Sequence, residues 1–166
     1  GVSVNGSGTP IANVPTTGSA VYPGSSPTGG AVGVYFVPSG TGGISAGSLT
    51  GDVSLTANFG TGAVTGTLSN MVATPAAGGA ATPWNNVSLS ATINRLPNNA
   101  SFIGTTSTTG APATAGTAGF SSAATGGLGG GFFGPNMEEI GGTWTLTDPN
   151  ATGGGKTAFG ALAGAK

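Results

Sequence analysis

The sequence has 166 residues, which is about one domain and enough to bury a core. Charged residues make up 4% of it, against roughly 25% in ordinary soluble domains. It contains no histidine and no cysteine, which excludes triads built on those residues, Cys/His zinc sites and disulfide scaffolds. The three cations Arg95, Lys156 and Lys166 are too far apart in sequence to form a nucleic-acid-binding patch. We therefore expect no enzyme, no catalytic, cofactor-binding or metal-binding residue, and no nucleic-acid partner.

The shortage of charge is itself informative, because dispersed charges normally keep soluble proteins apart. The mean hydropathy is +0.21, and Val, Ile, Leu and Phe recur along the chain, so the high glycine content indicates a folded β protein with glycine-rich turns. A protein with so little surface charge is expected either to be covered by another molecule or to belong to an assembly.

Residues 1–30 are predicted to form an extended arm in front of a single domain that spans residues 31–166. Pro10, Pro15, Pro23 and Pro27 prevent a helix in this arm. The beginning at Gly1, without a signal-like segment, is expected for a mature secreted product.

Strand patterns begin after the arm. The segment 49–59 alternates apolar or small residues with polar ones, and Gly60-Thr61-Gly62 then predicts a tight hairpin. The further strand candidates are 32–37, 64–68, 87–93, 100–105, 120–124, 140–146 and 157–162. Their number and spacing predict an all-β fold, a small antiparallel β-barrel of about eight strands. No run of 18 apolar residues predicts a transmembrane helix.

Two segments carry a family resemblance. The run 131–144 (GFFGPNMEEIGGTW) with the terminal Ala158-Phe159-Gly160-Ala161, and the hairpin 55–68, resemble transferrin-binding protein B-like β-barrels over roughly residues 45–166. The resemblance implies an eight-stranded antiparallel barrel at the outer surface of Gram-negative bacteria. It also implies capture of host proteins, haem or metal-carrier proteins, without enzymatic activity. Unlike the better-known members, this chain has no anchoring cysteine, has little surface charge, and carries a long arm.

Several residues resemble parts of functional sites but are expected to have structural roles. Glu138 and Glu139 are adjacent, so in a strand they point to opposite faces; in a turn they are expected to bind loop amides. The segment 150–157 imitates a phosphate-binding loop but is expected to be a hairpin loop, because no helix pattern follows it. The possible iron ligands Tyr22, Tyr35, Met71 and Met137 are expected to be packing or surface residues.

Two functions remain open. The first is a structural subunit that assembles into a surface filament or layer, a homopolymer joined by β-augmentation through its N-terminal strand. The expected assembly residues are Val2, Val4, Ile11, Val14 and Val21. The alternative is a secreted or cell-surface barrel that captures a protein or haem ligand on loops 73–86 or 107–116. Trp84, in the first of these loops, is the candidate contact residue. We favour the interpretation that it packs over the end of the barrel instead. Both functions place the protein outside the cell or on the bacterial outer surface.

Overall fold

The structure is a computed structural model. It describes residues 6–26, 29–39, 42–95, 97, 99–109, 118–150 and 155–166. In these ranges no helix has the length and apolar character needed to cross a membrane.

Nearly all of the regular structure in the described ranges is β-strand, apart from a short 3-10 helix, η1 (Ile11–Asn13). The strands are β1 (Ser19–Gly24), β2 (Gly30–Pro38), β3 (Ile44–Asn58), β4 (Ala63–Pro75), β5 (Thr82–Pro83), β6 (Val87–Arg95), β7 (Ala100–Thr108), β8 (Thr125–Phe133), β9 (Glu139–Asp148) and β10 (Lys156–Ala165). The expected strands are confirmed except for 120–124, which lies in the loop just before β8, and most of the others extend beyond their expected limits.

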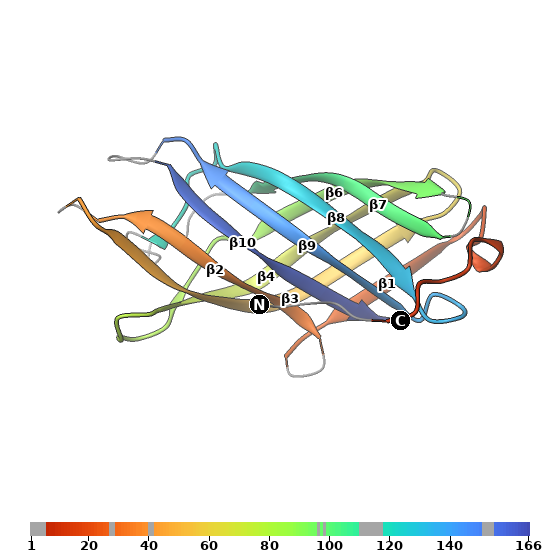
Figure 1. The fold of residues 1–166 in the computed structure, drawn as a ribbon, viewed down its shortest axis with the longest axis horizontal. Helices are drawn as coiled ribbons and strands as arrows, with labels where there is room; N and C mark the ends of the chain where they lie inside the picture. Colours follow the sequence, from red (N-terminus) through yellow and green to blue (C-terminus); the bar gives the residue numbers. More distant parts are fainter. Residues whose placement is uncertain are drawn as a thin grey trace.

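The strands form one antiparallel sheet that closes on itself (Figure 1). Its order is β3-β2-β10-β9-β8-β7-β6-β4, and pairing of β4 with β3 completes a ring of eight strands. Closure supplies hydrogen-bond partners at both sides of each ring strand, which an open sheet lacks at its edges. The expected small antiparallel barrel is therefore confirmed.

Strand β1 extends the barrel wall into the range that was expected to be an arm. It pairs with β3 from Ser19↔Asn58 to Gly24↔Val53, and β2 pairs with the remainder of β3 from Ala31↔Gly51 onward. Both strands are antiparallel to β3, and each pairs with a different part of it, so β1 and β2 lie one after the other along β3. Pro23 in β1 is compatible with this position, because proline is tolerated in strands at a sheet edge.

The core follows from the alternation of side chains along the strands. In β9, for example, Ile140, Trp144 and Leu146 are buried while Thr143 and Thr145 are exposed. Aromatic rings fill part of the interior, where Phe132 lies 5.9 to 6.1 Å from the rings of Tyr22, Phe59 and Phe102. A closed sheet of eight strands has an interior that such side chains can fill.

Candidate functional site

One end of the barrel is covered by the N-terminal segment. Thr9 donates its backbone N–H to the Phe132 carbonyl at 2.9 Å and its hydroxyl to the Gly134 carbonyl at 2.6 Å. Val14 is buried in the core, and the Arg95 guanidinium donates to the carbonyls of Val14 and Pro15. The described part of this segment is therefore held by its own barrel.

The opposite end is covered by the loop that precedes β8. Phe120 is fully buried there, and its backbone N–H and carbonyl bond the Asn85 side chain, each at 2.8 Å. Asp148 accepts hydrogen bonds from the Ser121 backbone at 2.6 Å and the Ser121 hydroxyl at 2.8 Å. Burial tends to raise the pKa of Asp148, but these bonds and one from the Asn150 backbone outweigh it, so its pKa is lowered.

Trp84 belongs to this covered end. Its ring packs 5.2 Å from Phe120 and 6.4 Å from Trp144, and its Nε1 donates to the Ala118 carbonyl at 2.8 Å. The side chain is buried, so packing over the barrel end is confirmed and Trp84 offers no surface for a ligand. In the loop 73–86, residues 76–82 are largely exposed; within 107–116, residues 110–116 lie outside the described residues.

The other residues that resemble parts of functional sites have structural roles. Glu138 accepts hydrogen bonds from the Asn136 backbone at 2.9 Å and the Asn136 side-chain amide at 3.0 Å, as expected for a turn carboxylate. These bonds lower the pKa of Glu138. Lys156 begins a strand rather than a helix and donates to the Gly119 carbonyl, which excludes a phosphate loop of the usual kind. The described residues contain no cluster of three or more acidic, His or Cys side chains that could hold a metal ion.

The four possible iron ligands are all buried in the core. Their exposed fractions are 0% for Tyr22, 3% for Tyr35, 2% for Met71 and 3% for Met137. Burial, with a smaller contribution from Glu138, raises the pKa of Tyr22 to about 12, and burial also raises the pKa of Tyr35. Their expected packing role is therefore confirmed.

The expected assembly residues lie in different environments. Val2 and Val4 lie outside the described residues. Ile11 is partly buried and packs against the core from η1, and Val14 is buried. Val21 lies on β1 opposite Thr56 and is 52% exposed. The three described residues, Ile11, Val14 and Val21, do not form one exposed patch.

The outer wall of the barrel carries an apolar face that runs over β2 and β10. Phe36 and Phe159 are 38% and 46% exposed, and their rings stack with centroids 6.0 Å apart. Ile44 at the start of β3 is 76% exposed, opposite Pro38. We call these outward side chains, together with Val32 and Val34 of β2, the apolar face. Exposed apolar patches of this kind mark interaction sites.

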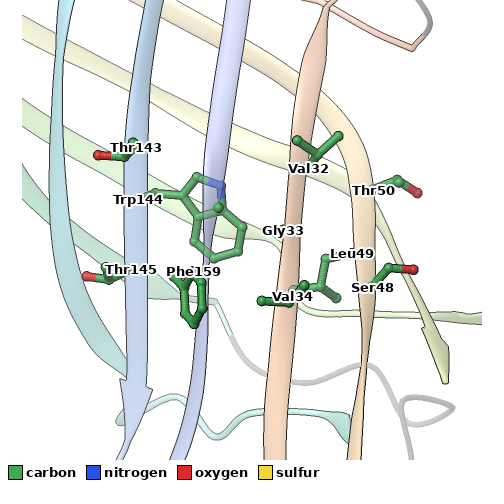
Figure 2. A pocket seen from close by; sticks show the side chains of 11 residues that line it. Val32, Gly33, Val34, Ser48, Leu49, Thr50, Thr143, Trp144, Thr145 and Phe159 are labelled. Carbon is green, nitrogen blue, oxygen red and sulfur yellow. The ribbon is translucent and has the colours of Figure 1, made fainter. Parts of the chain in front are cut away.

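A hollow of about 620 Å³ crosses this face, and we call it the outer hollow (Figure 2). It is lined by eleven of the twelve residues in three neighbouring cross-strand rows on β9, β10, β2 and β3; only Ala161 is missing. The rows are Thr143–Ala161–Val32–Thr50, Trp144–Gly160–Gly33–Leu49 and Thr145–Phe159–Val34–Ser48.

The middle row forms the floor and the outer two rows form the walls. Trp144 and Leu49 of the middle row are 1% exposed and belong to the core, so this row points inward. Because side chains alternate along a strand, the two flanking rows point outward. Figure 2 shows Thr143 and Thr145 at one side of the hollow and Ser48 and Thr50 at the other, with Val32, Val34 and Phe159 between them.

Sequence reasoning missed the outer hollow, although one signal of it was present. The segment Val32–Val37 is apolar at nearly every position, so apolar side chains occupy both faces of that strand. In a strand with one face in water, the outward positions are normally polar. An uninterrupted apolar run in an antiparallel barrel therefore indicates an apolar outer surface.

Comparison with known proteins identifies the architecture. The family model described as the C-lobe and N-lobe β-barrels of Tf-binding protein B matches residues 14–166. No curated protein gives a significant match to the sequence. A crystal structure of a single mutant of the vaccine antigen transferrin-binding protein B from Haemophilus parasuis Hp5 is 21% identical with a TM-score of 0.56. A double mutant of the same antigen is 20% identical with a TM-score of 0.54.

These alignments cover 96% of this chain but 29% and 28% of the two solved chains. The chain therefore spans less than a third of the length of these relatives. At this identity the structural similarity shows a shared fold.

Proposed function

The chain belongs to the family of the C-lobe and N-lobe β-barrels of transferrin-binding protein B, and from this premise we propose that it is a non-catalytic barrel that captures a protein ligand. Membership in this family bears out the expected location outside the cell or on the bacterial outer surface. It supports the ligand-capturing alternative better than the structural subunit.

The observation that carries this proposal is the exposed apolar face on a barrel whose two ends are covered. The N-terminal segment covers one end and the Phe120 loop covers the other, and core side chains fill the space between them. A partner must then contact the outside of the molecule. The pair Phe36 and Phe159, with Ile44 nearby, supplies exposed aromatic and aliphatic area of the kind that forms the centre of protein interfaces.

A protein ligand fits this chain better than haem does. The sequence has no histidine or cysteine, and both tyrosines and both methionines are buried, which leaves haem iron without the usual axial ligands at the surface. A haem titration that produced a saturable absorbance change would contradict this preference.

Transferrin is the first protein to test, because the solved relatives are named for binding it. The chain would be immobilised and exposed to iron-loaded and iron-free transferrin, with other serum proteins as further analytes. We expect saturable binding of one of them. Replacing both Phe36 and Phe159 by Ser should weaken it about tenfold or more, because buried aromatic anchors dominate such interfaces.

The matched control is Ile103→Ser, which removes an exposed apolar side chain (64% exposed) from β7, outside the apolar face. Equal loss of binding in the control and the double variant would contradict a role for the apolar face. Binding of no protein in the panel would contradict capture of those proteins.

Homopolymer assembly through the N-terminal strand stays a prediction. Neither the comparisons nor the described contacts of residues 6–24 provide support for it. Negative-stain electron microscopy of the purified chain tests it directly, since ordered filaments or layers would favour the structural subunit.

A further inference from the structure

We propose that the outer hollow binds the acyl chain of a single lipid molecule with an uncharged headgroup, with the chain lying across β9, β10, β2 and β3. The inference concerns a small ligand and does not rest on the capture of a protein.

The dimensions of the hollow fit one chain. Its two walls are two residues apart along each strand, about 6.4–6.8 Å, and its floor crosses four strands, about 14 Å. Its volume of about 620 Å³ is within the range of small-molecule sites, about 300–1,000 Å³. A second barrel or a flat bilayer would rest on the wall side chains and leave the floor without contacts, whereas an inserted chain would contact both walls and the floor.

The chemistry of the lining selects an uncharged aliphatic group. None of the eleven lining residues is ionisable, so a charged ligand would lose its hydration without a partner. Val32, Val34 and Phe159 make the middle of the hollow apolar. Hydroxyl groups stand at both ends, from Thr143 and Thr145 on β9 and from Ser48 and Thr50 on β3. A neutral polar headgroup can hydrogen-bond these hydroxyls while its chain covers the middle.

The floor is thin at the paired residues Gly33 and Gly160, which carry no side chain on its core side. A Cβ at Gly33 would lie 2.6 Å from the Phe159 carbonyl oxygen and 2.9 Å from the Trp144 ring, so the ring lies directly beneath this floor. A ligand in the hollow would consequently lie within a few ångströms of the Trp144 indole. This gives the site a local optical probe.

The test uses dodecyl maltoside with bromine atoms on its alkyl chain, kept below its critical micelle concentration and added to the full chain. Bromine quenches tryptophan fluorescence at short range, so we expect saturable quenching that unbrominated dodecyl maltoside reverses and maltose does not affect. Val34→Asp, which places a carboxylate in one wall, should weaken binding about tenfold or more. Ile103→Asp adds the same charge to an exposed apolar position on β7 and should leave binding unchanged.

Circular dichroism and thermal unfolding would show whether both variants fold equally well. If Val34→Asp does not fold, Phe159→Ser removes part of the same wall from a side chain that is 46% exposed, and weaker binding is again expected. Equal affinity of wild type and a folded wall variant would overturn the proposal. So would quenching that begins only when micelles form.

Two further measurements distinguish other occupants of the outer hollow, namely a second copy of the chain and a bilayer surface. Concentration-dependent dimerisation in sedimentation, abolished by Val34→Asp and without binding of the monomeric detergent, would assign the hollow to a second copy of the chain. Flotation with neutral phosphatidylcholine vesicles, with no binding of the monomer, would assign it to a bilayer surface. Either result would overturn the single-chain proposal. Failure to bind any protein in the preceding section's panel would leave this test unaffected.

Discussion

Gly33 on β2 pairs directly with Gly160 on β10, and the indole ring of Trp144 lies against this pair on the core side. A Cβ on Gly160 would collide with the Val32 carbonyl oxygen, and a Cβ on Gly33 would press on the Trp144 ring. The two glycines therefore allow close approach of the strands, and the tryptophan supplies the packing that glycine cannot. The same pair forms the floor of the outer hollow.

Replacing Gly160 by valine should destabilise the barrel by about 1–3 kcal/mol or more, because the added side chain overpacks a site bounded by backbone. Urea denaturation monitored by circular dichroism measures the free energy of unfolding. Gly127→Ala is the control, since the nearest atom to its new Cβ would be the Thr145 Oγ1 at 3.6 Å, an ordinary contact. Equal stability of the two variants would contradict the packing argument.

The fold was largely predictable because period-two alternation is a local property of the sequence. The pattern in 49–59 and 140–146 predicted β3 and β9 without any tertiary information. Strand β1 was missed because Gly, Pro, Ser and Thr dominate residues 1–30 and obscure the short alternation around Tyr22. Its strand conformation depends on pairing with β3, which is distant in sequence.

The candidate site was not predictable in the same way. The outer hollow depends on the register of β9, β10, β2 and β3, and a shift of one residue would replace its floor with outward side chains. The burial of Trp84 depends on the loop that carries Phe120, which follows some 35 residues later. Such long-range pairings leave little trace in local periodicity.

Asp148 should make stability depend on pH in acid. Its pKa is lowered in the folded state, so its contribution is present above the ordinary value of 3.8 and is lost as the pH falls through the lower folded pKa. Asp148→Asn should lower the free energy of unfolding at pH 7 by about 1–3 kcal/mol, because the amide cannot accept all the hydrogen bonds from Ser121 and Asn150.

The measurement is urea denaturation between pH 7 and pH 2. The difference between wild type and Asp148→Asn should shrink as the wild-type carboxylate is protonated. The control is Asp52→Asn, which makes the same change of charge on β3 and leaves the loop contacts of Asp148 in place, so it should not reproduce the loss of stability at pH 7. A difference that stays constant down to pH 2 would show that the carboxylate charge contributes nothing.

Two N-terminal truncations test whether the described contacts of the N-terminal segment are needed for the stability of the barrel. Removing residues 1–5 deletes none of the described contacts, and this form serves as the reference for the longer truncation. Removing residues 1–24 deletes β1 together with the buried Val14 and Tyr22, and uncovers the edge of β3. We expect this form to aggregate or to unfold at a much lower temperature, as monitored by circular dichroism and light scattering. A stable monomer lacking residues 1–24 would instead support an independent barrel that begins near residue 31.

The Tyr22→Phe variant should be more stable than wild type at high pH and at least as stable at neutral pH. Its hydroxyl is buried and has no hydrogen-bond partner among the described residues, so Tyr22→Phe removes an unsatisfied polar atom worth about 1–3 kcal/mol. Its pKa is raised to about 12, so ionisation of the phenol favours the unfolded chain, and the stability of wild type should fall as the pH rises from 10 to about 12. Alkaline unfolding with tyrosinate absorbance tests both effects, because wild type should unfold at lower pH than the variant. The control for the effect at pH 7 is Tyr35→Phe, since the Tyr35 hydroxyl is not among the unsatisfied atoms. A loss of stability in Tyr22→Phe at pH 7 would mean that the hydroxyl has a partner, such as a bound water.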